Sequence, residues 1–117
     1  MMKDSETTLG ELRALVAQFV RERDWEQFHD PKNLAMSIAI EAAELMEHFQ
    51  WDRNDQIPGL FDEAGKREEV EEELADVICY CLSLANHLEI DLAEAVEKKM
   101  IKNASKYPGE EYRGRHS

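Results

Sequence analysis

The stretch DPKNLAMSIAIEAAELMEHFQW, residues 30–51, has the pattern of one amphipathic helix with a glutamate on its apolar face. Asp30 followed by Pro31 predicts the helix start, because aspartate caps backbone amides and proline suits the first turn. At about 100° per residue, one face collects the apolar side chains of Leu34, Ile38, Leu45 and Phe49. Glu41 falls on the same face, and a buried lone carboxylate needs a cation or a strong partner. This helix therefore predicts both a packed fold and a site.

Helical periodicity recurs on both sides of this stretch. Thr8 and Glu11 form a capping box that starts a first helix, which fades near Asp24. A loop-like connector containing proline and glycine covers residues 52–67, and a long helix follows it. The apolar face of that helix carries Val70, Leu74, Val77, Cys81, Leu84 and Leu88. These segments predict two more helices of the same amphipathic kind.

A last helix opens at Asp91, where Glu94 completes a second capping box. The sequence Tyr-Pro-Gly at residues 107–109 stops it. No alternating run of β-branched residues appears anywhere in the chain. Four amphipathic helices in one small chain predict an all-α fold of the helical-bundle type.

Length and charge bound the class of protein. With 117 residues we expect a single domain over residues 1–117, with a core at about 8–108 and a flexible tail at 109–117. The 26 acidic residues outnumber the 14 Lys and Arg, and the net charge of −12 argues against binding polymeric nucleic acid. The chain lacks an apolar run of about 18 residues and a signal-peptide pattern, so we expect no membrane span and a cytoplasmic location.

Two pairs of acidic residues lie beside apolar faces, Glu41 with Glu44 and Glu73 with Asp76. Residues three apart project to one side of a helix, so two facing helices would place four carboxylates around a shared space. Oxygen ligands suit Mg²⁺, which keeps positions open for water and substrate phosphate. A solvated helix face explains the same pairs in so acidic a chain, and the pattern leaves both interpretations open.

Further candidates for ligand binding lie on the last helix and at helix ends. The inner face of the last helix carries Lys99, Asn103 and Tyr107. They suit phosphate, sugar or base, and they equally suit a lysine that snorkels and a tyrosine that packs. Trp25 and His29 lie in the turn between the first two helices, and Trp51 lies at the far end of the second. Such aromatic rings either stack on a nucleobase or cap a core.

The motif EAAE at residues 41–44, with ELAD at 73–76, resembles the E-x-x-E…E-x-x-D signature of the MazG-like all-α nucleoside triphosphate pyrophosphohydrolases. Three longer motifs resemble the dCTP pyrophosphatase branch of that family: RDWEQFH at 23–29, ELMEHFQW at 44–51 and KMIKNASKYP at 99–108. The likeness runs from about residue 10 to residue 108, and the longer motifs are more specific than the four acids alone.

This resemblance implies a four-helix bundle-like MazG-type fold that assembles as a homo-oligomer, a tetramer favoured over a dimer, with a neighbouring chain completing each site. It implies Mg²⁺-dependent hydrolysis, with Mn²⁺ as an alternative, of dCTP and 5-modified dCTP to dNMP and pyrophosphate in nucleotide-pool sanitation. The implied metal ligands and catalytic residues are Glu41, Glu44, Glu73 and Asp76. The implied substrate-binding residues are Trp25, His29, Trp51, Tyr80, Lys99, Asn103 and Tyr107.

Two alternatives stay open. A different base preference would make the protein a dUTP pyrophosphatase or a broad-specificity dNTP pyrophosphatase. A non-catalytic acidic helical interaction module would instead pair Glu41 with a buried lysine or arginine. Turnover of any dNTP separates an enzyme from the module, and a panel of bases separates the two enzymes.

Overall fold

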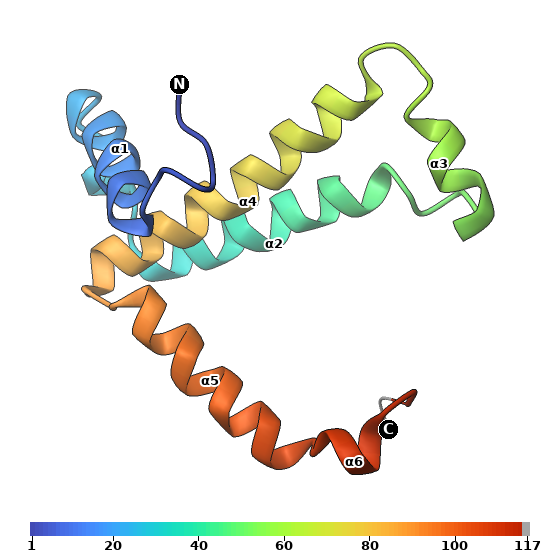
Figure 1. Cartoon of the computed structure of the whole chain (residues 1–117). Coiled ribbons are helices and arrows are strands. Elements are labelled where there is room, and N and C mark those ends of the chain that lie inside the picture. Colours follow the sequence, from blue (N-terminus) through green and yellow to red (C-terminus); the bar gives the residue numbers. More distant parts are fainter. Residues whose placement is uncertain (116–117) are drawn as a thin grey trace.

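The computed structural model describes residues 1–115, and these form helices joined by turns (Figure 1). The four long helices are α1 (Leu9–Glu22), α2 (Pro31–Glu47), α4 (Lys66–Leu88) and α5 (Leu92–Lys106). The short elements are the 3-10 helices η1 (Glu26–Phe28) and η2 (Asn54–Gln56) and the helices α3 (Ile57–Leu60) and α6 (Gly109–Tyr112). The predicted all-α class is confirmed for the described residues.

The predicted starts of three helices are confirmed by side-chain caps. The capping side chains belong to Thr8, Asp30 and Asp91, which accept from the backbone amides of Glu11, Asn33 and Glu94 at 3.1, 2.8 and 3.0 Å. Each cap satisfies one of the amides that an N-terminal turn leaves without a partner. Helix α2 ends at Glu47, earlier than the predicted end at Trp51, because residues 48–51 form turns instead.

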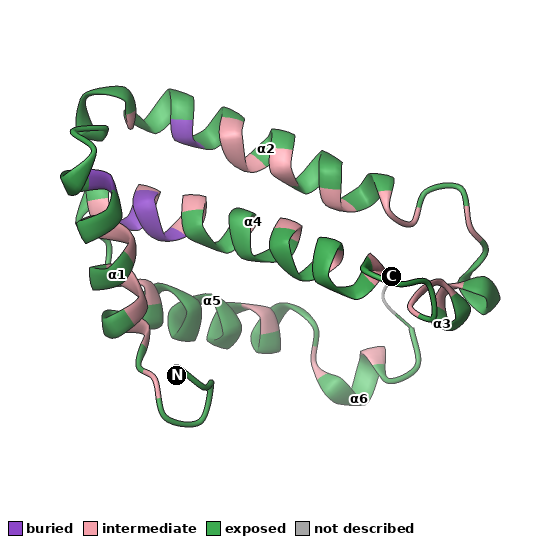
Figure 2. Cartoon of the chain, turned by 90° about the horizontal axis from the view of Figure 1, so that it is seen from above, coloured by how far each residue is buried: buried purple, intermediate pink, exposed green. Residues whose placement is uncertain are grey.

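Helices α1, α2 and α4 pack together, with α2 lying along α4 and α1 against its C-terminal half (Figure 1). The buried core sits where the three helices meet, at one end of the molecule (Figure 2), and it consists of Val20, Leu34, Leu82 and Ala85. Arg13 fastens α1 to the end of α4, because its Nε donates to Asn86 Oδ1 at 3.0 Å and Asn86 Nδ2 donates back to the Arg13 carbonyl at 3.1 Å. The core thus fixes the mutual placement of α2 and α4.

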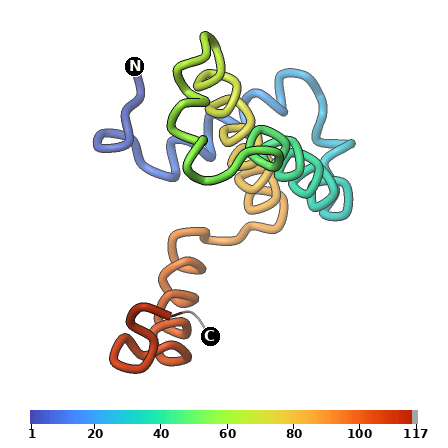
Figure 3. Tube along the Cα trace, turned by 90° about the vertical axis from the view of Figure 1, so that its right-hand side faces the viewer, coloured from blue at the N-terminus to red at the C-terminus, as the bar shows by residue number. Residues whose placement is uncertain are grey.

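Helix α5 turns away from the other three and projects with α6 into the space beside them (Figures 1 and 3). Its apolar side chains stay uncovered by the described residues of its own chain, since Met100 is 60% exposed and Val96 and Ile101 are exposed as well. A contiguous exposed apolar face of this kind marks a surface that another molecule covers. The bundle that the sequence predicts therefore has three of its helices packed within one chain.

The predicted connector at residues 52–67 contains η2 and α3, and Gly65 takes a left-handed conformation (φ 82°) immediately before α4. The predicted tail at 109–117 begins with the short helix α6, while its residues 116–117 lie outside the described residues. Within residues 1–115, no helix combines the length and the apolar content needed to cross a membrane.

Candidate metal and nucleotide site

Three carboxylates from two helices converge between α2 and α4. Glu41 on α2 and Glu73 and Asp76 on α4 each offer an oxygen, and these oxygens lie within 4.8 Å of one another. The three meet because α2 and α4 lie side by side, and because Glu73 and Asp76 are one helical turn apart. One acid of the predicted pair on α2 thus faces both acids of the predicted pair on α4.

Two of these side chains hold oxygens that protein atoms cover without any hydrogen bond. Glu41 Oε2 and Glu73 Oε2 have no donor within reach among the described residues. The pKa of Glu41 is raised to about 7, first because burial disfavours its charge and then because the carboxylates of Glu73 and Glu44 lie nearby. A divalent cation would relieve both effects, since it supplies positive charge to oxygens that have no other partner.

Glu44 lies one turn beyond Glu41 on α2 and is exposed. It is outside the group of three converging oxygens, although its carboxylate is close enough to help raise the pKa of Glu41. The structure therefore brings three of the four predicted acids together, and Glu44 lies outside that group. The donor set is all oxygen and anionic, which fits a hard cation such as Mg²⁺ or Mn²⁺.

A cavity of about 440 Å³ opens beside the carboxylates, between α1, the turn that follows it and α4. Three predicted substrate-binding residues line it: Trp25, His29 and Tyr80. Asp76 lines it too, so one side chain belongs both to the carboxylate group and to the cavity. The His29 ring lies 6.5 Å from the Tyr80 ring, and His29 Nδ1 is covered without a hydrogen-bond partner.

Sequence reasoning missed most of the remaining cavity wall, which consists of Leu15, Val16, Phe19, Val20, Cys79 and Ser83. Leu15 and Phe19 belong to the apolar stripe of α1, so the pattern assigned them to the core, yet both are exposed. The sequence signal that could have found them is Trp25, just past the end of α1, whose ring packs against that of Phe19. The wall is mostly apolar, as a site for a flat aromatic ligand requires.

A smaller cavity of about 240 Å³ shares Val20, His29 and Ser83 with the larger one. Its other lining residues are Ala17, Arg21, Glu26, Asn86 and His87. None of the four predicted metal ligands lines it, so the larger cavity is the one that adjoins the carboxylates.

The remaining predicted residues lie apart from this group within one chain. Trp51 is 87% exposed and follows the end of α2, away from the turn that carries Trp25. Three others sit on or just after the projecting helix α5: Lys99, Asn103 and Tyr107. The Tyr107 ring packs edge-on against the Tyr112 ring at 5.2 Å instead of entering the cavity. A single chain therefore joins the carboxylates to Trp25, His29 and Tyr80 only.

Comparison with known proteins gives concordant matches. A family model described as MazG-like matches residues 36–117. The protein dCTP pyrophosphatase 1 of Mus musculus is 45% identical over 104 residues, covering 88% of this chain and 61% of the relative, and that of Homo sapiens is 44% identical with the same coverage. The chain thus spans about three fifths of the length of these relatives. A pyrophosphatase of known crystal structure from Archaeoglobus fulgidus superposes with a TM-score of 0.80 at 43% identity, over 92% of this chain and 99% of that chain.

Proposed function

The chain belongs to the MazG-like family, and from this premise we propose that it is a Mg²⁺-dependent nucleoside triphosphate pyrophosphohydrolase. Its substrates are dCTP and 5-modified dCTP, which it cleaves to dNMP and pyrophosphate in the cytoplasm as part of nucleotide-pool sanitation. The base preference rests on the similarity to proteins named dCTP pyrophosphatase 1. One structural observation supports the reaction class above all others: Asp76 joins a group of carboxylates to a cavity walled by Trp25, His29 and Tyr80.

We assign the cation to Glu41, Glu44, Glu73 and Asp76. The orphaned oxygens of Glu41 and Glu73 are the feature that fits it, because a buried carboxylate oxygen without a donor otherwise costs free energy. A cation held there would supply positive charge to the phosphate oxygens and would acidify a bound water. Glu44 is exposed and stands outside the group of three oxygens, so one of its oxygens would reach the cation while the other would stay free to accept the proton of the attacking water.

The cavity would take the nucleobase. Its wall is apolar where Trp25 and Phe19 lie, and His29 offers a covered nitrogen, Nδ1, that has no partner in the described residues. A base stacked on an aromatic ring and hydrogen-bonded at its edge would use both features. Because Asp76 lines the cavity, a nucleotide with its base seated there would direct its phosphates toward the carboxylates.

A second copy of the chain would complete each site, with a tetramer favoured and a dimer as the alternative. This proposal is supported by α5, which projects away from the other helices and exposes apolar side chains (Figure 3). Lys99 and Asn103 lie on α5, and Tyr107 directly follows it. In a neighbouring copy, Lys99 would offset the charge of phosphate oxygens, while Asn103 and Tyr107 would contact sugar and phosphate. Trp51 of a neighbouring copy would likewise contact the base and form one wall of its pocket.

A substrate panel tests the proposal. The protein is incubated with each dNTP and with 5-methyl-dCTP in Mg²⁺ or Mn²⁺, and the products are resolved as dNMP and pyrophosphate. We expect the fastest turnover with the two cytosine nucleotides. Equal rates for all bases would replace the cytosine preference with broad specificity, and a preference for dUTP would replace it with that activity. Absence of turnover from folded, metal-loaded protein would leave the non-catalytic interaction module.

A further inference from the structure

The backbone of Trp25 is fixed by the turn that carries it. Asp24 adopts a left-handed conformation with φ 53°, and the Trp25 amide donates to the carbonyl of Val20 at 3.0 Å. Gln27 Nε2 donates to the Asp24 carbonyl at 3.0 Å and closes the turn from the other side. A non-glycine residue with positive φ is uncommon, and neighbouring contacts must hold it in place. This turn brings the Trp25 side chain back over the end of α1.

The Trp25 ring itself is only partly enclosed, since 43% of the residue is exposed. Among the described residues, its aromatic neighbour is Phe19, whose ring centroid lies 5.7 Å away at an interplanar angle of 75°. This edge-to-face geometry is one of the favourable arrangements of two aromatic rings. Both rings line the 440 Å³ cavity, where they form two nearly perpendicular walls. The orientation of Trp25 therefore depends on where Phe19 lies.

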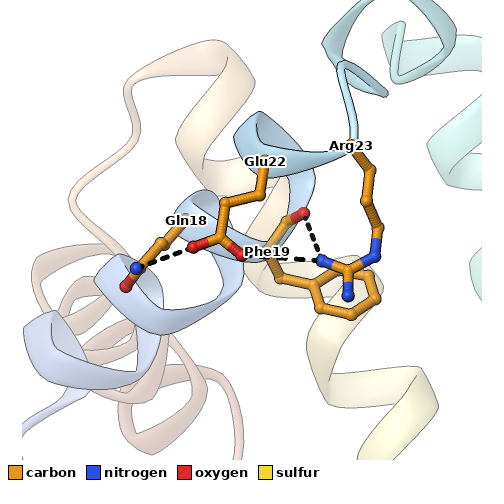
Figure 4. Close-up of polar contacts among 4 residues, drawn as sticks. All are labelled: Gln18, Phe19, Glu22 and Arg23. Carbon is orange, nitrogen blue, oxygen red and sulfur yellow. Dashed lines mark hydrogen bonds and ion pairs between the residues drawn. The ribbon is translucent and has the colours of Figure 1, made fainter.

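Phe19 is in turn held by Arg23, which is not among the residues that line the cavity. The Arg23 guanidinium carbon lies 3.7 Å from the centroid of the Phe19 ring, and Arg23 Nη1 donates to the Phe19 carbonyl at 3.1 Å (Figure 4). Glu22 lies 3.8 Å from the same nitrogen and accepts a hydrogen bond from Gln18 at 2.9 Å. The hydrogen bond to the backbone carbonyl anchors the guanidinium on the last turn of α1, and the cation–π contact holds it against the Phe19 ring.

We propose that Phe19 and Arg23 are positioning residues that hold the Trp25 ring as a preformed wall for the nucleobase. The role of that wall rests on the proposed function. Phe19 sets the angle of Trp25 by direct contact, and Arg23 acts through Phe19. A wall that is already ordered spares the ligand the entropy cost of ordering it, so it strengthens base binding without taking part in the chemical step.

Fluorine NMR of protein labelled with fluorotryptophan tests the positioning directly. The chain has two tryptophans, and Trp51→Phe assigns the two resonances. We expect Arg23→Gln and Phe19→Leu to shift or broaden the Trp25 resonance and to leave that of Trp51 unchanged. In otherwise unsubstituted protein, the probe dCMP should shift the Trp25 resonance, and Arg23→Gln should weaken this response. An unchanged Trp25 resonance in Arg23→Gln, or one that ignores dCMP without the substitution, would overturn the proposal.

Kinetics separate a positioning role from a general loss of structure. Arg23→Gln should raise KM for dCTP by about two- to five-fold with kcat unchanged, the range expected for one exposed cation–π contact. Arg23→Lys, which retains the cation, should restore part of the affinity. The matched control is Arg67→Gln, because the Arg67 guanidinium carbon lies 5.9 Å from the centroid of the Phe61 ring and neither residue lines the cavity. If no dNTP is turned over, the proposed function fails, and the NMR response to Arg23→Gln still decides the positioning.

Discussion

Helices α2 and α5 carry apolar faces of similar pattern, but only the face of α2 is packed against another helix of the same chain. Helix α2, which packs along α4, buries Leu34, whereas α5 leaves Val96 and Met100 exposed. The candidate site divides along the same line, because the carboxylate of Glu41 lies in the packed part and Lys99 lies on the projecting helix. Under the proposed function, one chain holds the carboxylates that would bind the metal, and a second chain would supply the groups that contact phosphate.

The largest expected effect comes from removing one charge in the packed part. Glu41→Gln should lower turnover by more than about 100-fold. Even the mutation of residues that only orient metal ligands lowers metal affinity or activity by about 10- to 100-fold. The fold should survive, because the substitution removes a buried charge that is repelled by Glu73 and Glu44. Turnover and thermal unfolding of both proteins check this. Unfolding of the variant, in place of loss of activity, would indicate that Glu41 is a structural residue.

A second test asks whether the two parts of the site come from different chains. Lys99→Ala should also lower turnover, by about 100-fold for one lost group that stabilises developing charge. Co-refolding chains that carry only Glu41→Gln with chains that carry only Lys99→Ala should restore about a quarter of the unsubstituted activity in a two-fold pair. Each variant refolded alone is the control. If the mixture recovers no activity, Lys99 does not complete a site on another chain. It then acts within its own chain or belongs to no site.

One substitution in each apolar face distinguishes the buried face of α2 from the exposed face of α5. Leu34→Ala should destabilise the fold by about 2–5 kcal/mol, because it opens a cavity in the buried core. Met100→Asp should leave the helical content unchanged and lower the oligomer mass, since the face it alters is exposed within the chain. Denaturant unfolding measures the first effect, and light scattering measures the second. An unchanged mass for Met100→Asp would mean that α5 is not an interface.

Much of the packed part could be predicted from the sequence because its determinants are local. The capping residues Asp30 and Asp91 predicted helix starts that the structure confirms, and the helical period placed Glu41 on an inward face. The convergence of Glu41 with Glu73 depends on which helices pack together, and the resemblance to a family supplied that step. The helical periodicity of the sequence could not show that α5 projects away from the other helices, because an apolar stripe has the same pattern whichever molecule covers it.

The base cavity was predicted in part for a different reason. Trp25 and His29 stood out as aromatic residues at a helix end, whereas Phe19 had the pattern of an ordinary core position. Its role became visible only through three-dimensional contacts, the stacking of Arg23 and the edge of Trp25. Trp51 illustrates the converse, because α2 ends at Glu47 and leaves this residue exposed in a turn.

The smallest expected effect is a pH dependence of the metal-free protein. The pKa of Glu41 is raised from 4.5 to about 7, so below pH 4.5 the group is protonated in both the folded and the unfolded chain. As the pH rises from 4.5 to 7, the unfolded chain releases this proton first, and the stability that the protonated form provided is lost. Thermal unfolding in a chelator should show Glu41→Gln losing less stability across this window. Parallel curves for the two proteins would contradict the raised pKa.

Binding of Mn²⁺, followed by electron paramagnetic resonance, tests the central claim that acids of α2 and α4 form one metal site. We expect Glu41→Gln and Glu73→Gln, which lie on different helices, each to abolish the signal of bound Mn²⁺. Glu47→Gln on α2 and Glu71→Gln on α4 are matched controls, because both residues are exposed and lie outside the converging group, and they should bind Mn²⁺ as the unsubstituted protein does. Full Mn²⁺ binding by either Glu41→Gln or Glu73→Gln would show that the acids of α2 and α4 do not form one metal site.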